Sequence, residues 1–278
     1  MKIIQSATFV CALMLLSLQP GIASDSDNNP ADMNPAVDAA TMAATTNNGA
    51  GDNLAPFQIL EKTREKYASL TSYSDEGQVV ATLNGGVINT SFMTRLARKN
   101  YYMIGWQQNV ESLYNTNSTQ PQAVWSAGAG NFLDTGLGPV DEGSREIALA
   151  LARENSGGAA VTIPKTFFNI TRGDQLDDAW SPQDRLPDEI AGGVDCYVLS
   201  NELQGRTRTL WIGKQDHLIR QIRTVTSADA LQTMMARNFN WDREKISTIQ
   251  NFTMTETHTQ IMVNQSFLRS DFIPASGE

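Results

Sequence analysis

A run of short segments in which apolar and polar residues alternate limits the possible folds of this chain more than any other feature. In residues 87–98, Ile88, Phe92 and Leu96 fall on one face of an extended chain, and polar residues fall on the other. This pattern is typical of β-strands that are buried on one side. Strands are expected at residues 78–83, 87–98, 101–108, 122–127, 131–135, 194–202, 206–213 and 218–227, with a further pair within 247–263.

The connections between these segments have the composition of hairpin turns. Asn84-Gly85-Gly86 and Gln204-Gly205 are two examples, since Asn and Gly tolerate a positive φ. Strands joined in this way form an antiparallel sheet, and a sheet of this many strands twists and curls. Residues 101–108 are apolar on both faces, which predicts that a helix or a ligand covers each side of this strand.

Helical patterns flank and interrupt the strands. Pro56 suits the first position of a helix whose apolar residues repeat at helical spacing as far as Leu70. A second helix is expected over residues 142–154 with Asp141 as its cap, and residues 228–245 are expected to form a short helix or a long excursion. Residues 159–190 are expected to be irregular. The predicted fold class is therefore α+β, a curved antiparallel sheet with helices on its concave face.

The first 55 residues have a different character. Residues 1–23 have the features of a secretory signal: Lys2, an apolar stretch over 3–18 and small residues before position 24. The stretch is too short, and too abruptly followed by acidic residues, for a membrane span. Residues 24–55 are polar and lack periodicity, which predicts a disordered linker. The expected organisation is a signal over 1–23, a linker over 24–55 and one domain over 56–278.

Charge and rare residues exclude several classes of function. The formal net charge is −9, and removal of residues 1–23 takes away Lys2 and no acid, which gives −10. Such a chain is a poor partner for nucleic acid or for anionic lipid head groups. The two histidines, His217 and His258, and Cys196 lack the spacing of metal ligands, and Cys196 is expected to be a buried, inert thiol. No catalytic serine motif occurs, so no enzyme, cofactor or metal site is predicted.

Several motifs, taken in order, resemble the LolA/LolB-like superfamily of outer-membrane lipoprotein carriers, and more closely its branch of uncharacterised periplasmic proteins. They are Ile59-Leu60-Glu61-Lys62, residues 67–77, Phe92-Met93-Thr94-Arg95, Val124-Trp125-Ser126-Ala127-Gly128, Cys196-Tyr197-Val198-Leu199, Leu210-Trp211-Ile212-Gly213-Lys214 and residues 218–222. The resemblance implies an unclosed β-barrel lidded by helices, an apolar cavity for acyl chains and a periplasmic location. The sequence locates no equivalent of the arginine that locks the lid in these carriers.

Aromatic side chains on the expected strands are the candidate ligand-binding residues. They are Phe92, Tyr102, Trp106, Trp125, Phe132 and Trp211. An inward-facing subset would line an apolar cavity, whereas the alternative for each residue is ordinary core packing. Arg95, Arg98 and Lys99 either lie at the mouth of such a cavity or protect a strand end.

The sequence thus predicts a periplasmic, non-enzymatic binding protein that holds an acyl chain of a lipid or lipoprotein between sheet and helices, and that is not an integral membrane protein. The alternative is an envelope module that docks a protein, or senses stress, with the same fold. An open groove lined by Trp and Phe would favour the carrier, and a filled interior would favour docking.

Overall fold

The computed structural model describes residues 54–109, 122–156, 158, 162–169, 176, 184–239 and 247–274. Residues 1–53, which include the expected signal and nearly all of the expected linker, lie outside the described residues. Within the described ranges the chain forms a single sheet of eleven strands, four α-helices and one 3-10 helix.

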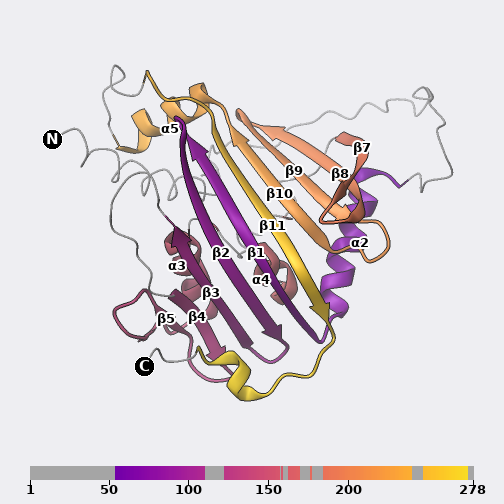
Figure 1. Ribbon diagram of the computed structural model, residues 1–278, viewed down its shortest axis with the longest axis vertical. Coiled ribbons are helices and arrows are strands. Elements are labelled where there is room, and N and C mark those ends of the chain that lie inside the picture. Colours follow the sequence, from indigo (N-terminus) through magenta and orange to yellow (C-terminus); the bar gives the residue numbers. More distant parts are fainter. Residues whose placement is uncertain are drawn as a thin grey trace, which may run out of the picture.

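The strands lie in the order β6-β5-β4-β3-β2-β1-β11-β10-β9-β8-β7, and every neighbouring pair is antiparallel (Figure 1). The last strand therefore lies at the centre, and β6 and β7 form two open edges, so the sheet is not closed into a barrel. The strands are β1 (Ser72–Leu83), β2 (Gly86–Ala97), β3 (Tyr101–Asn109), β4 (Gln122–Ala127), β5 (Phe132–Asp134), β6 (Val140–Asp141), β7 (Asp184–Ala191), β8 (Val194–Leu203), β9 (Arg206–Gly213), β10 (Ile219–Thr226) and β11 (Phe252–Val263).

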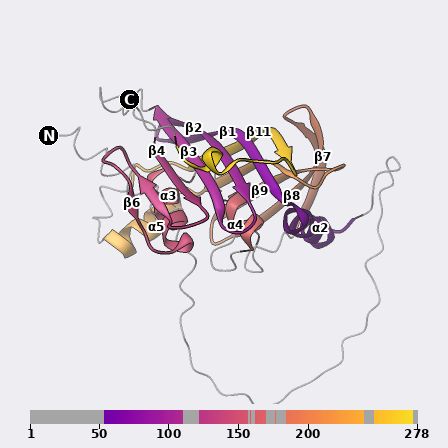
Figure 2. The ribbon, with the colours of Figure 1, turned by 90° about the horizontal axis from the view of Figure 1, so that it is seen from below.

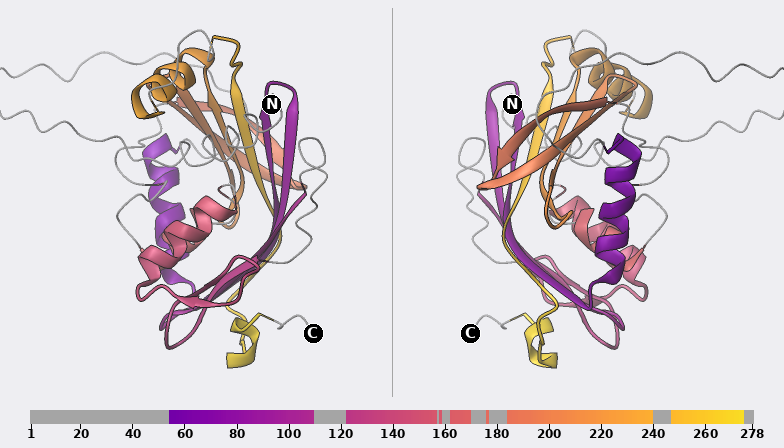
Figure 3. Two further views of the ribbon diagram at one scale, coloured as in Figure 1. Left: turned by 90° about the vertical axis from the view of Figure 1, so that its left-hand side faces the viewer. Right: turned by 90° about the vertical axis from the view of Figure 1, so that its right-hand side faces the viewer.

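The helices cover one face of the curved sheet, which we call the inner face (Figures 2 and 3). They are α2 (Pro56–Ser69), α3 (Arg145–Asn155), α4 (Thr162–Phe168) and α5 (Ala228–Phe239). Buried side chains from all four helices and from the inward positions of the strands form one hydrophobic cluster. The predicted fold class, a curved antiparallel sheet with helices on its concave face, is confirmed.

The C-terminal segment covers part of the opposite, outer face. After β11 the chain continues to the 3-10 helix η2 (Arg269–Phe272), where Phe272 packs against Met103 and Ala127. β3 is thus covered by helices on one side and by this segment on the other, which accounts for its two apolar faces.

Local sequence explains the hairpins. Asn84 and Gly85 have φ of 49° and 79°, and Gln204 and Gly205 have φ of 53° and 73°. Positive φ at both central residues is the requirement of the two-residue turn whose twist matches that of paired strands. Both predicted hairpins are confirmed, with two-residue turns.

Several predicted boundaries are wrong. β1 begins at Ser72 rather than at residue 78. The chain over 247–263 holds one strand rather than two, and this long strand, β11, pairs with β1. The region expected to be irregular contains α4 and β7. Pro187 is tolerated in β7 because this is an edge strand with a register shift beside the proline.

The start of α3 also differs from the prediction. Its cap is Ser144, whose hydroxyl accepts a hydrogen bond from the Ile147 N–H, and not Asp141. Asp141 lies in β6, and its carboxylate accepts hydrogen bonds from the N–H groups of Gly143 and Asn131. The acid therefore orders the loop before the helix rather than the helix end.

Candidate functional site

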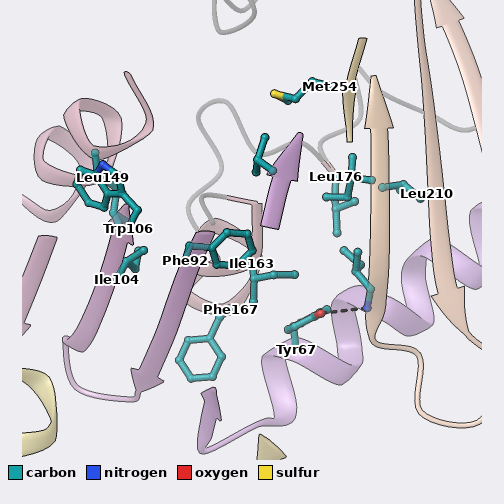
Figure 4. Close-up of a cluster of buried hydrophobic side chains, with 14 of the residues drawn as sticks. Tyr67, Phe92, Ile104, Trp106, Leu149, Ile163, Phe167, Leu176, Leu210 and Met254 are labelled. Carbon is teal, nitrogen blue, oxygen red and sulfur yellow. Dashed lines mark hydrogen bonds between the residues drawn. The ribbon is translucent and has the colours of Figure 1, made fainter. Parts of the chain in front are cut away.

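Three of the six predicted aromatic residues lie on the inner face of the sheet. Phe92, Tyr102 and Trp106 lie on it, with exposed fractions of 5%, 0% and 2%. β2 and β3 pair Phe92 with Trp106, so these side chains project to the same side. Figure 4 shows both in the cluster that includes Ile163 and Phe167 of α4.

The other three aromatic residues lie on the outer face. Trp125 pairs in register with Phe132 and stacks on it, with ring centroids 5.6 Å apart, beside the cluster under the C-terminal segment. Trp211 packs against Cys196 and Val198, and its Nε1 donates a hydrogen bond to Glu189. The six residues therefore do not line one surface, and a ligand between sheet and helices would meet only the first three.

Charged side chains interrupt the apolar inner face at its centre. Asp75 of β1 and His258 and Glu256 of β11 are almost completely buried, and we call them the Asp75–His258–Glu256 row. His258 Nδ1 lies 2.6 Å from Asp75 Oδ2, which also accepts a hydrogen bond from the Tyr73 hydroxyl at 2.8 Å. His258 Nε2 lies 3.4 Å from Glu256 Oε1 without hydrogen-bond geometry, and Thr162 of α4 donates to Glu256 Oε2 at 3.4 Å.

A glycine makes room for this arrangement. Gly77 pairs with both Phe92 and His258, and the Phe92 ring lies over it with its centroid 5.5 Å from that of the imidazole. A Cβ at Gly77 would overlap the Phe92 ring and the Thr257 carbonyl oxygen. The absence of a side chain at position 77 therefore lets an aromatic ring cover the buried histidine.

The surroundings of His258 favour its protonated form. Burial lowers the pKa of the imidazole, but the hydrogen bond to Asp75 and the charges of Glu256 and Asp75 raise it, and Arg220 opposes them weakly. The net result is a pKa above the ordinary value for histidine. The row thus places the imidazole between two acidic side chains that stabilise its protonated form.

A pH dependence of stability follows. Because the pKa of His258 is higher in the folded than in the unfolded chain, its stabilisation is fully present below about pH 6.5 and is lost as the pH rises through the folded-state pKa. We expect the free energy of unfolding, measured by urea denaturation, to fall as the pH rises above about 6.5. This fall should be much smaller in His258→Gln and retained in His217→Gln. Equal slopes in all three proteins would contradict the assignment.

Arg98 joins two helices to the end of β2. Its guanidinium donates hydrogen bonds of 2.5–2.8 Å to four backbone carbonyl oxygens, those of Tyr67, Ala68, Leu70 and Phe167. The first three lie at the C-terminal end of α2 and the fourth in the last turn of α4, where carbonyls lack helical partners and the helix dipole is negative. The guanidinium also lies over the Phe167 ring, 4.1 Å from its centroid. Partial burial lowers the pKa of Arg98, yet arginine stays protonated at neutral pH.

The two other cations predicted beside Arg98 lie elsewhere. Arg95 faces the outer side of the sheet and donates a hydrogen bond to the Asp271 carbonyl oxygen at 3.1 Å. Lys99 is exposed in the turn after β2. The three residues do not form one cationic mouth, and only Arg98 contacts the helices that cover the sheet.

The sequence analysis missed the role of one residue and the whole of one group. It named Arg98 as a candidate, but not its contacts with two helix ends, because backbone acceptors leave no trace in a sequence. The Asp75–His258–Glu256 row does leave one, because Met254, Glu256 and His258 alternate along one strand and place polar residues at inward positions. Asp75 escaped notice because it lies in a stretch that resembles a turn.

Among the described residues no group of three or more His, Cys, Asp or Glu side chains is placed to hold a metal ion. Within the same ranges no helix has both the length and the apolar character that crossing a bilayer requires. Cys196 is buried, as predicted, and burial raises the pKa of its thiol.

No protein-family model matches the sequence, and no curated protein is significantly similar to it. Similar solved structures include the MucA/MucB complex of Pseudomonas aeruginosa, with 12% identity, 78% of this chain covered and a TM-score of 0.41. The match covers 60% of the other chain. LprF from Mycobacterium bovis has 11% identity, coverage of 76% of this chain and 93% of the other, and a TM-score of 0.36. A LolA superfamily protein from Nitrosomonas europaea has 11% identity, coverage of 79% and 97%, and a TM-score of 0.31. A member of the family that the sequence resembles is thus among the solved structures similar to this chain.

Proposed function

We propose that this chain is a non-enzymatic binding protein of the periplasm that takes an acyl chain of a lipid or lipoprotein between its sheet and its helices. In this proposal residues 1–23 direct export, and residues 24–55 link the binding domain to the N-terminus. Binding is driven by the burial of apolar surface, at about 0.8 kcal/mol for each methylene group.

The observation that carries the proposal is that helices cover the inner face of the sheet. Separate helices, rather than a second sheet, bury Phe92, Tyr102 and Trp106, and α4 is only seven residues long. Such a helix depends on tertiary contacts for its stability. Displacement of α4 would expose an apolar surface on a sheet whose strands remain paired, and a ligand chain would replace the side chains of Ile163 and Phe167.

Arg98 has a defined place in this proposal. It is the polar connection between the strand and the ends of α2 and α4, so it stabilises the closed arrangement without contributing to the apolar surface. We propose that it performs the role of the locking arginine for which the sequence alone offered no candidate.

Native purification of the full chain tests the proposal. An organic extract is expected to contain lipid detectable by mass spectrometry, and the delipidated protein is expected to bind the uncharged probe phenylnaphthylamine. Trp106→Phe should weaken probe binding about fivefold, which corresponds to about 1 kcal/mol, because Trp106 faces the helices.

Trp125→Phe is the matched control, since Trp125 lies on the neighbouring strand but on the outer face. It should leave probe binding unchanged. A folded protein that carries no lipid and binds no probe would overturn the proposal.

One observation favours the alternative function, the docking of a protein. In the described residues, buried side chains of α3 and α4 belong to the same hydrophobic cluster as Trp106 and Phe92, and the loop and helix beside them expose Leu137 (95%) and Ile147 (52%). Helices that pack closely on the sheet, beside exposed apolar side chains, suit a module that binds through its surface. Absence of probe binding, in a protein whose circular dichroism is native, is the result expected of this alternative.

A further inference from the structure

The C-terminal segment leaves two large apolar side chains exposed at one end of the molecule. Phe267 and Phe272 pack on the outer face, where Phe272 is buried and its ring centroid lies 5.4 Å from that of Tyr101. Leu268 and Ile273, which follow these two residues directly and flank the helix η2, are 73% and 51% exposed. The segment thus packs one pair of apolar side chains and presents another pair to solvent, a pattern typical of a contact surface.

Cationic side chains lie at the same end of the molecule. Lys99 and Arg269 are exposed, the first in the turn between β2 and β3 and the second in η2. Arg95 connects the two elements, because its Nη1 donates a hydrogen bond to the Asp271 carbonyl oxygen at 3.1 Å. Figure 1 shows η2, in yellow, at the end of the sheet where β2 passes into β3, and α5 at the opposite end.

The charge of this end differs from that of the whole chain. The formal net charge is −9, but residues 77–109 contain three cations and no acid. These cations are Arg95, Arg98 and Lys99. Arg269 adds a fourth, and the acids to set against them are Asp271, Glu76 on the outer face of β1 and Glu278 further along the sequence. A positive end on an acidic protein is drawn toward an anionic surface while the rest of the molecule is repelled, which orients the protein.

We propose that this end docks the protein on the surface of a bilayer with anionic head groups, through Lys99, Leu268, Arg269 and Ile273, which we call the η2 patch. The two apolar side chains enter the head-group region, and the two cations bind lipid phosphates. Two apolar side chains and a few cations give weak, reversible binding. Arg98, which connects β2 to the ends of α2 and α4, directly precedes Lys99, so the docked end is also the end at which the covering helices are held. The inference concerns a different surface from the inner face and does not depend on the proposed ligand.

Flotation of the full chain with vesicles of two compositions tests the inference. Vesicles of phosphatidylcholine and phosphatidylglycerol should bind the protein at least about tenfold more tightly than vesicles of phosphatidylcholine alone. Because salt screens the attraction between the cations and the head groups, binding to the anionic vesicles should fall strongly when the salt concentration is raised to about 0.5 M. Equal binding to both vesicles, or binding that salt does not weaken, would overturn the inference.

Two pairs of exposed residues locate the surface. Arg269→Gln should weaken binding to the anionic vesicles about fivefold, the effect of one cation near such a surface, and Leu268→Ser about tenfold. Arg237→Gln is the control for the first variant, since Arg237 is an exposed arginine of α5 at the opposite end of the sheet. Leu203→Ser is the control for the second, since Leu203 is exposed at the end of β8 that leads to the turn beside α5. Both controls should bind as the unaltered chain does, and equal losses within a pair would contradict the placement of the surface.

Two further results separate this inference from its neighbours. A protein that binds soluble polyglutamate but neither vesicle would recognise an acidic polypeptide, which would overturn the inference of a lipid surface. Leu268→Ser should bind phenylnaphthylamine as the unaltered chain does, and Trp106→Phe should retain binding to the anionic vesicles. Failure of the docking inference therefore leaves the proposed function standing, and the reverse also holds.

Discussion

Replacement of His258 by leucine is expected to lower the free energy of unfolding by about 3–5 kcal/mol, the usual effect of removing one partner of a buried ion pair. Leucine has a comparable size, so little of the loss should come from a cavity. The loss should come from the two buried acids, because Asp75 and Glu256 would lose the imidazole that lies 2.6 Å from one and 3.4 Å from the other. Urea denaturation at neutral pH measures the change.

A double-mutant cycle distinguishes this cause from altered packing. If Asp75 is already asparagine, the loss caused by His258→Leu should be smaller by more than about 1 kcal/mol, because one of the two carboxylates is gone. Glu76→Gln, on the exposed face of the same strand, should change stability by less than about 0.5 kcal/mol. Additive effects of the Asp75 and His258 substitutions would show that the two side chains are not coupled.

Arg98→Met is expected to destabilise the protein by about 2–3 kcal/mol and to loosen α2 and α4. Hydrogen bonds from a charged donor contribute about 1.5–3 kcal/mol each, but their effects are not additive and Arg98 is partly exposed to solvent. Four carbonyl groups at two helix ends would lose their common donor. Amide hydrogen exchange should therefore accelerate at the end of α2 and throughout α4.

Two further variants sharpen the test of Arg98. Arg98→Lys retains the charge, but a single ammonium group cannot reach all four carbonyls, so it should restore only part of the stability. Arg95→Met removes a cation three residues away that contacts the outer-face segment instead. It should leave the exchange of α2 and α4 unchanged. Unchanged exchange of both helices in Arg98→Met would refute the role assigned to this arginine.

The elements that the sequence predicted well are those fixed by neighbouring residues. The turns at Asn84-Gly85 and Gln204-Gly205 depend on φ preferences of two residues, and β4 and β9 have the bounds that alternation predicts. α4 gave no such signal, because its seven residues include a proline and owe their burial to the sheet beneath them. The helical conformation of α4 is therefore set by its tertiary contacts rather than by the local preferences of its residues.

The candidate site was less predictable because it depends on register between strands. Alternation placed Phe92 correctly within β2, but only the pairing of Trp125 with Met103 assigns Trp125 to the outer face. The contact between Asp75 and His258 joins residues 183 positions apart, and no local pattern relates them. Residue types indicated an apolar face, whereas the contact of Asp75 with His258 at its centre could be recognised only in the fold.

The central place of β11 has a consequence for how the chain reaches its native state. Strands β1 to β6 on one side and β7 to β10 on the other are joined within the sheet only through the last strand. The two halves can form hairpins during synthesis, but they cannot join into one sheet until residues 252–263 are available. Such late, long-range strand pairing is slow. Until it occurs, the unpaired edges of β1 and β10 are the surfaces that a chaperone would have to shield.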